Sequence, residues 1–266
     1  MNKKLARLFL AALVALPFPA FAQDHPVQIT AHRGFWKSEK TKDSENSLAS
    51  LRLAQKTQLW GSEFDVHLTG DNVVIVNHDN TIEGVPIHET PYQALKAYKL
   101  PNGESRPTLD QYLKKGRRSG TVLVLEIKAM ETDERTILLT DLCIQKLIDH
   151  GLYDPSRVIF ISFNLAACKH LAVVAPAFTT QYLSGDIDPD TLHGYGINGL
   201  DYHFLQLVKH PEWVTRAHEL GMSVNCWTVN KEKDLRKMIE LGVDCITTNE
   251  PLLTRELLGD REQRSR

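Results

Sequence analysis

Short β-branched runs alternate with amphipathic helical stretches along the sequence from residue 27 to residue 247. Strands separated by a helix run parallel in a sheet, because a crossover connection returns the chain to the same edge. Glycines placed like left-handed C-terminal residues follow three of the helical stretches, at Gly151, Gly221 and Gly242. The strand-like runs span residues 27–31, 62–68, 73–77, 122–127, 158–162, 178–183, 199–202, 223–229 and 244–247, and clear helical stretches span 47–56, 134–150, 211–220 and 231–241.

These strand-like runs are one more than a closed barrel of eight parallel strands requires. Runs 62–68 and 73–77 are joined by Thr69-Gly70-Asp71-Asn72, which is typical of a hairpin and too short for a crossover helix. We therefore predict an α/β fold, a (β/α)8 TIM barrel with an antiparallel hairpin extension after the second strand. One domain takes in residues 23–266, with a short helix near 92–98 in the loop after the hairpin.

Residues 1–22 have the pattern of a secretory signal peptide. Three basic residues precede an apolar run over residues 8–18, and Ala20-Phe21-Ala22 supplies the small residues of a cleavage site. The run is shorter than the roughly 20 residues that cross a bilayer, so a retained anchor is the weaker alternative. We expect export to the periplasm or the extracellular space and no stable membrane anchor. Cleavage would make the formal net charge of −2 more negative, so we expect no nucleic-acid partner.

The four cysteines, Cys143, Cys168, Cys226 and Cys245, lie within apolar helix or strand patterns. Export would place them in an oxidising compartment, where four cysteines allow three pairings. No two of them have the spacing of a zinc site. We expect buried free thiols that take no part in the chemistry.

Three carboxylates fall where strand-like runs end. Glu63 and Asp65 are two residues apart on one strand, so both point to the same face, and Glu126 lies near the end of another strand. Active sites of barrels form at the C-terminal ends of the strands, so these groups are expected to converge. Three converging carboxylates need a counter-charge, and a hard divalent cation with oxygen ligands, Mg²⁺ or Ca²⁺, provides it.

Histidines and cationic residues lie at the same strand ends. His32 and Arg33 follow the first strand, His78 ends the returning hairpin strand, and Lys128 shares a face with Glu126. Two histidines beside an ion can share the roles of general base and general acid, and the cations suit an anionic transition state. Each motif alone is common in ordinary strands and loops, and the prediction depends on their joint placement.

Three further residues border this predicted site. Phe163 and Trp227 end strands and are expected to line the pocket, although both could simply cap the core. His67 shares a face with Asp65 but lies on the hairpin, where a solvated role and a contact to substrate are equally compatible with the pattern.

Together these motifs resemble the ordered signature of the glycerophosphodiester phosphodiesterase family, of the exported bacterial type. The resemblance covers residues 28 to 252 and is specific as an ordered set. It rests on Ala31-His32-Arg33-Gly34, Ser44-Glu45-Asn46-Ser47, Gly61-Ser62-Glu63-Phe64-Asp65-Val66, Val74-Ile75-Val76-Asn77-His78-Asp79, Leu125-Glu126-Ile127-Lys128, Ser162-Phe163 and Trp227-Thr228-Val229-Asn230.

The resemblance implies a TIM-barrel phosphoric diester hydrolase that cleaves glycerophosphodiesters to glycerol 3-phosphate and an alcohol. By position it implies metal ligands at Glu63, Asp65 and Glu126, an acid–base pair at His32 and His78, phosphate contacts at Arg33 and Lys128, an acidic residue beside the metal at Glu45, and an aromatic contact to the glycerol at Trp227. We expect His32 to act as base and His78 as acid. Water and the glycerol 2-hydroxyl both remain open as the nucleophile.

The sequence departs from the family pattern at two positions. The usual proline before Glu-Asn is Ser44, whose hydroxyl is expected to cap the following helix. The late Thr-Asp-x-Pro pattern appears as Thr248-Asn249-Glu250-Pro251, which removes a carboxylate and puts any role at that position in doubt.

Two other functions remain as alternatives. A phospholipase D-like enzyme acting on intact lipids or lysolipids would need an apolar patch at the barrel mouth. A catalytically silent protein that binds phosphodiesters would be expected to lose a histidine or a carboxylate, and this chain keeps all five.

Overall fold

A computed structural model describes residues 26–264, so the predicted signal peptide lies outside the described residues. A single sheet closes on itself in the order β1-β11-β10-β9-β8-β7-β6-β2, and β3 pairs antiparallel with β2. The predicted (β/α)8 barrel with a hairpin after its second strand is therefore confirmed. The strands are β1 Gln28–Ala31, β2 Gly61–Leu68, β3 Val74–Val76, β6 Val122–Ile127, β7 Val158–Ser162, β8 Thr179–Tyr182, β9 Gly199–His203, β10 Ser223–Trp227 and β11 Cys245–Thr248.

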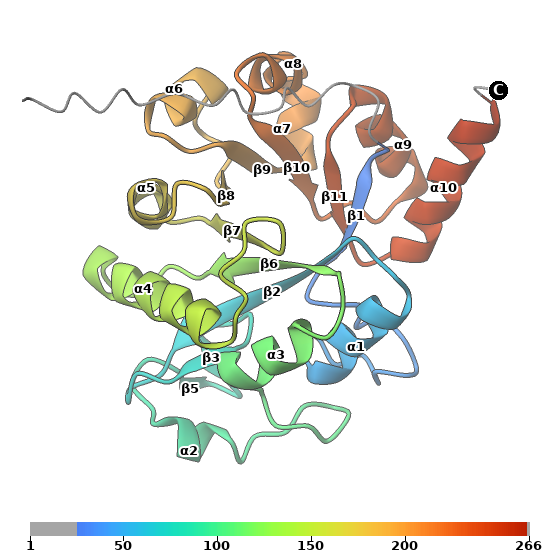
Figure 1. Ribbon diagram of the computed structural model, residues 1–266. Helices are drawn as coiled ribbons and strands as arrows, with labels where there is room; N and C mark the ends of the chain where they lie inside the picture. Colours follow the sequence, from blue (N-terminus) through green and yellow to red (C-terminus); the bar gives the residue numbers. More distant parts are fainter. Residues whose placement is uncertain (1–25, 265–266) are drawn as a thin grey trace, which may run out of the picture.

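Helices surround the barrel and connect its strands (Figure 1). The structure confirms the four helices expected from the sequence and adds others that were not assigned from the pattern, among them α5 and α10. It also adds a small hairpin, β4 Thr81–Ile82 and β5 Val85–Pro86, next to the short helix α2. The helices are α1 Leu48–Lys56, α2 Tyr92–Leu95, α3 Leu109–Gly116, α4 Asp133–Asp149, α5 Leu165–Val174, α6 Pro189–Gly194, α7 Phe204–Lys209, α8 Glu212–Glu219, α9 Glu232–Leu241 and α10 Pro251–Arg264.

The start of α1 differs from the expectation for Ser44. The N-cap is Ser47, whose hydroxyl accepts from Ser50 N while the Ser50 hydroxyl accepts from Ser47 N. The Ser44 hydroxyl instead accepts from Asn102 N at 3.0 Å, so it ties the segment before α1 to a distant loop. A capping box on the helix itself satisfies its first amides, which leaves Ser44 free for that contact.

Strand alternation divides the barrel into an apolar outer face and an interior that also holds polar and charged side chains. On β2, Phe64 and Val66 belong to the hydrophobic cluster under the helices, and the Phe64 ring stacks on Tyr112 with centroids 4.2 Å apart. Glu63 and Asp65, on the opposite face of the same strand, are buried inside the barrel. Packing of the outer face fixes which side chains of β2 point into the barrel, because a one-residue slip would exchange the inward-facing and outward-facing residues.

Two glycines allow neighbouring strands to pack closely inside the barrel. A Cβ added at Gly61 would lie 2.3 Å from Oγ1 of Thr30, and one added at Gly199 would lie 2.5 Å from Oγ of Ser223. Neither position has room for a side chain, so glycine is required there for close packing between neighbouring strands.

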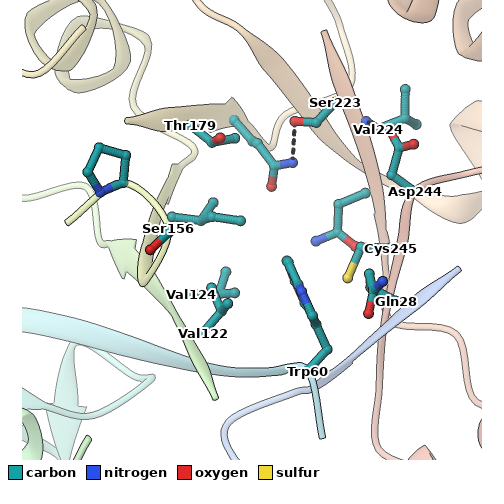
Figure 2. Close-up of a pocket in the computed structure, with 14 residues that line it drawn as sticks. Gln28, Trp60, Val122, Val124, Ser156, Thr179, Ser223, Val224, Asp244 and Cys245 are labelled. Atoms are coloured by element: carbon teal, nitrogen blue, oxygen red, sulfur yellow. Dashed lines mark hydrogen bonds between the residues drawn. The ribbon is translucent and has the colours of Figure 1, made fainter. Parts of the chain in front are cut away.

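A cavity of about 240 Å³ lies at the N-terminal ends of the strands (Figure 2). Trp60, Val122 and Val124 form part of its wall, and the Gln181 side chain donates to the Ser223 hydroxyl at 3.0 Å. The one carboxylate in its lining, Asp244, already accepts from Val224 N at 2.7 Å. The histidines and carboxylates expected from the sequence to act in catalysis all lie toward the other end of the barrel.

Two further expectations concern the whole chain. The four cysteines are free and buried, as predicted. Among the helices of residues 26–264, none is long and apolar enough to cross a bilayer.

Candidate active site

A cavity of about 270 Å³ opens at the C-terminal ends of the barrel strands. The hairpin, the β1 turn and the ends of β6, β7 and β10 contribute residues from distant parts of the chain, as expected for a barrel active site. The lining includes seven of the ten residues singled out in the sequence, namely His32, Arg33, Glu63, His78, Glu126, Phe163 and Trp227. The other three, Glu45, Asp65 and Lys128, contact these residues from behind the lining.

Glu63, Asp65 and Glu126 form a buried carboxylate cluster. Each offers an oxygen that lies within 4.8 Å of the others. Burial, followed by the Asp65 charge, raises the pKa of Glu63 well above its usual value, and the same causes raise the pKa of Glu126 to about 8. Within residues 26–264, Oε1 of Glu63 has no hydrogen-bond partner. Oxygen ligands at this spacing, with one buried oxygen unpaired, fit a hard divalent cation.

Asp65 is the member of the cluster that stays ionised most readily. Asn46 donates to its Oδ2 at 2.8 Å, and Lys128 Nζ lies 3.2 Å from Oδ1 and 2.7 Å from Oε1 of Glu126. Burial opposes ionisation, but Lys128, His78 and the Asn46 hydrogen bond together lower the pKa of Asp65. Asn46 was not identified from the sequence as a site residue, although it lies inside the Ser44–Ser47 motif.

The turn after β1 brings the backbone into the cluster. Arg33 has a left-handed φ of 55°, and its N–H donates to Oε2 of Glu63 at 2.6 Å. Gly34 follows with a φ of 77°, and a Cβ there would lie 2.8 Å from Cβ of Ser50. Glycine adopts a positive φ readily, but the left-handed conformation of Arg33 is costly, and such strain is typical of functional sites. The Arg33 guanidinium pairs with Glu45 at 2.7 Å, which holds its charge at the cavity.

His32 is oriented by a neutral amide. Its Nδ1 lies 3.0 Å from Oδ1 of Asn249, and that same oxygen accepts from Nε1 of Trp36 at 3.0 Å. An indole N–H can only donate, so the amide presents its oxygen and Nδ1 of His32 carries the proton. Burial, followed by the charge of Arg33, lowers the pKa of His32 to about 4. His32 is thus a neutral imidazole whose Nε2 has a free lone pair.

His78 has a different partner. Its Nδ1 lies 2.7 Å from the Asp79 carboxylate, and its ring is about one-third exposed. Nε2 of His67 donates to the His78 backbone oxygen at 3.0 Å. His67 is 3% exposed, so the solvated role allowed by the sequence is wrong. It supports the backbone that carries His78.

Two aromatic rings form one wall of the cavity. The rings of Phe163 and Trp227 meet edge to face, with centroids 5.4 Å apart. Trp227 also packs against His203 at 5.3 Å and donates from Nε1 to the Asp201 backbone oxygen at 2.9 Å. The wall therefore joins β7 to β9 and β10 above the polar interior.

The structure adds a third buried carboxyl group, Asp201, to the cavity lining beside Glu63 and Glu126. It is 1% exposed, and burial, followed by the charge of Glu126, raises its pKa well above the usual value. Its position in the short run 199–202, two residues before His203, was the only signal in the sequence. Sequence reasoning missed it because a lone aspartate in a strand gives no indication of its neighbours.

The chain is similar in sequence and in structure to proteins of one family. The sequence model of the glycerophosphoryl diester phosphodiesterase family matches residues 32–253. A glycerophosphodiester phosphodiesterase of Caldanaerobacter subterraneus is 26% identical over 243 residues, covering 84% of this chain and 94% of the relative. The crystal structure of a glycerophosphodiester phosphodiesterase from Parabacteroides distasonis is 41% identical, with a TM-score of 0.85, covering 89% of this chain and 98% of that one.

A phosphodiesterase of Oleispira antarctica, solved in complex with the product sn-glycerol-3-phosphate, is also similar. It is 27% identical, with a TM-score of 0.74, and the match covers 88% of this chain and 97% of the other. The family match spans most of the sequence and includes all ten residues predicted for the site. This chain belongs to the glycerophosphoryl diester phosphodiesterase family.

Proposed function

We propose that this protein hydrolyses glycerophosphodiesters to glycerol 3-phosphate and an alcohol, with a divalent metal ion and two-histidine acid–base catalysis. One observation carries the proposal. A buried cluster of three carboxylates faces the same small cavity as two histidines with different partners and an arginine. The product complex of the Oleispira antarctica relative supports the substrate class.

Glu63, Asp65 and Glu126 would hold the ion. A bound Mg²⁺ or Ca²⁺ would offset their charge and stabilise the negative charge that develops on the phosphoryl oxygens. Arg33 at the cavity wall and Lys128 beside the cluster would hold the phosphate, because both carry fixed positive charge next to it. Phe163 and Trp227 would pack against the carbon skeleton of the substrate.

The partners of the two histidines support different roles. His32 donates from Nδ1 to a neutral amide and is uncharged, so its Nε2 can accept the proton of the nucleophile. His78 lies against the Asp79 carboxylate, a partner that complements a protonated ring, so its Nε2 can donate. The nucleophile forms the new P–O bond: either water gives glycerol 3-phosphate directly, or the glycerol 2-hydroxyl gives a cyclic phosphate that water then opens. The bond to the leaving alcohol breaks, and His78 protonates that oxygen.

Export is part of the proposal. Residues 1–22 support it through the basic start, the apolar run and the Ala-Phe-Ala site. Mass spectrometry of protein recovered from the exported fraction should give an N-terminus at or near Gln23. Intact Met1 in that fraction would remove the signal peptide from the proposal.

Residues that only support metal ligands typically contribute roughly 10- to 100-fold to activity. If Glu63 is itself a ligand, Glu63→Gln should lower turnover by more than that. Metal affinity, measured by calorimetry, should fall with it. Thermal unfolding of the metal-free variant should occur at the same temperature or higher, because one of three mutually repelling buried carboxylates is gone.

The control for this variant is Glu256→Gln, an exposed carboxylate on α10, which should behave like the wild type. Assays with glycerophosphocholine, glycerophosphoethanolamine and a lysolipid identify the substrate class by release of the head-group alcohol, which should be accompanied by glycerol 3-phosphate from the first two substrates. Full activity in excess chelator would contradict the metal assignment. Cleavage of the lysolipid alone would favour the phospholipase alternative.

The histidine roles predict losses on the order of 10²–10⁴-fold in turnover for both His32→Ala and His78→Ala. A diester with a p-nitrophenol leaving group needs no protonation, so it should rescue His78→Ala but not His32→Ala. His170→Ala, which removes an imidazole from an ion pair with Asp141 between α4 and α5, is the control and should leave turnover unchanged. If the p-nitrophenol diester restored turnover only in His32→Ala, His32 would be the acid and His78 the base.

The lowered pKa of His32 predicts an unusual pH profile of kcat/KM. Because the pKa of His32 is lowered to about 4, the base stays unprotonated and kcat/KM should hold its plateau down to about pH 5. In Asn249→Asp a carboxylate stabilises the imidazolium and raises the pKa, so the acidic limb should move to higher pH. If the wild type and Asn249→Asp have the same acidic limb at saturating metal, His32 is not the base.

A further inference from the structure

Asp201 lies near the end of β9 and is one of the residues that line the cavity. It is 1% exposed, and neither Oδ1 nor Oδ2 has a hydrogen-bond partner in the described part of the chain. It is also outside the group of carboxylates whose oxygens share one ion-sized site. Asp201 is therefore a buried carboxyl group that the proposed metal site does not use.

Such a group is costly to fold. Burying a polar atom without a partner is unfavourable by a free energy comparable to a lost hydrogen bond, and more for a charged group. Nearby side chains offset only part of this cost: burial keeps the pKa of Asp201 raised, although Asn225 acts to lower it. Trp227 donates to the backbone oxygen of Asp201, and Asn225, the register partner of Asp201 on β10, donates to Thr247 at 3.1 Å. An unpaired polar group held at a cavity wall points to a ligand that completes it.

The position of Asp201 limits which part of a ligand it can meet. In the barrel order, β9 is separated from β2 by β6, β7 and β8 on one side and by β10, β11 and β1 on the other. Asp201 therefore faces the carboxylate cluster on β2 from the opposite side of the barrel. The cavity has a volume of only about 270 Å³, so a small ligand bound at the cluster also reaches β9.

Charge decides the chemistry of that contact. Arg33 and Lys128 draw the phosphate to the β1, β2 and β6 side, away from Asp201. The glycerol that all glycerophosphodiesters share is uncharged and carries hydroxyl groups, which can pair with a carboxyl group in either protonation state. We propose that Asp201 binds the terminal hydroxyl of the substrate's glycerol, and thereby selects diesters that carry this hydroxyl; this inference rests on the proposed function.

The contact makes Asp201 a specificity-determining residue. Trp227 stabilises it by fixing the β9 backbone at the same point. A site built around a buried polar group discriminates strongly against an analogue that lacks the matching hydroxyl, because that analogue leaves the group unpaired. Leaving the buried carboxyl group unpaired corresponds to roughly 10- to 150-fold in kcat/KM.

The experiment compares two substrates at saturating metal. They are glycerophosphocholine and an analogue in which a hydrogen atom replaces the terminal hydroxyl of glycerol. The wild type should prefer glycerophosphocholine by roughly 10- to 150-fold in kcat/KM. In Asp201→Leu this preference should disappear through loss of activity on glycerophosphocholine, while the analogue is cleaved at about the wild-type rate. Asp201→Asn, which keeps a hydrogen-bonding group of the same shape, should restore part of the preference.

Thr180→Val is the matched control. Thr180 lies on the neighbouring strand β8, is 2% exposed and has an Oγ1 without a partner among the described residues, but it does not line the cavity. Its removal should leave the preference unchanged.

Two outcomes separate this inference from the proposed function. Equal losses on both substrates in the Asp201 variants would overturn the inference alone, since a metal-binding or purely structural role predicts them. A wild-type protein that cleaves no glycerophosphodiester would overturn the proposed function and this inference with it.

Discussion

Mutual repulsion among three buried carboxylates is the constraint around which the rest of the site is arranged. Glu63, Asp65 and Glu126 lie within 4.8 Å of one another inside a barrel that excludes water from most of their surface. Positive partners reach them from two directions, the Arg33 backbone amide and the Lys128 ammonium. These partners only partly offset the charge, since Glu63 and Glu126 keep raised pKa values. The remaining imbalance fits a cation.

The barrel can hold these charges because its stability comes from elsewhere. Phe64, Leu125 and Phe160 face outward into the large hydrophobic cluster beneath the helices. Burial of that outer face stabilises the fold, while the inner face keeps Gln181, Asp201 and other polar groups. Strand alternation thus separates the residues that stabilise the protein from those that perform its chemistry.

The two histidines have partners of different charge, and the roles proposed for them rest on that difference. His32 has the Asn249 amide, fixed by Trp36, whereas His78 has the Asp79 carboxylate. The replacement of aspartate by Asn249, which put the position in doubt when the sequence was considered alone, gives His32 a neutral partner. The same kind of side chain is then suited to accept a proton at one strand end and to donate one at another.

The sequence by itself determined the order of strands, the hairpin after the second strand and the face on which Glu63 and Asp65 lie. These follow from local periodicity and turn composition, which the chain carries wherever it folds. Only the tertiary structure decided that Asn249 orients His32, that His67 supports His78, that Ser47 rather than Ser44 caps α1, and that Asp201 faces the carboxylate cluster. His32 and Asn249 follow β1 and β11, which pair although they lie at opposite ends of the sequence, and Asp201 on β9 faces β2 across the closed barrel. No local pattern encodes either arrangement.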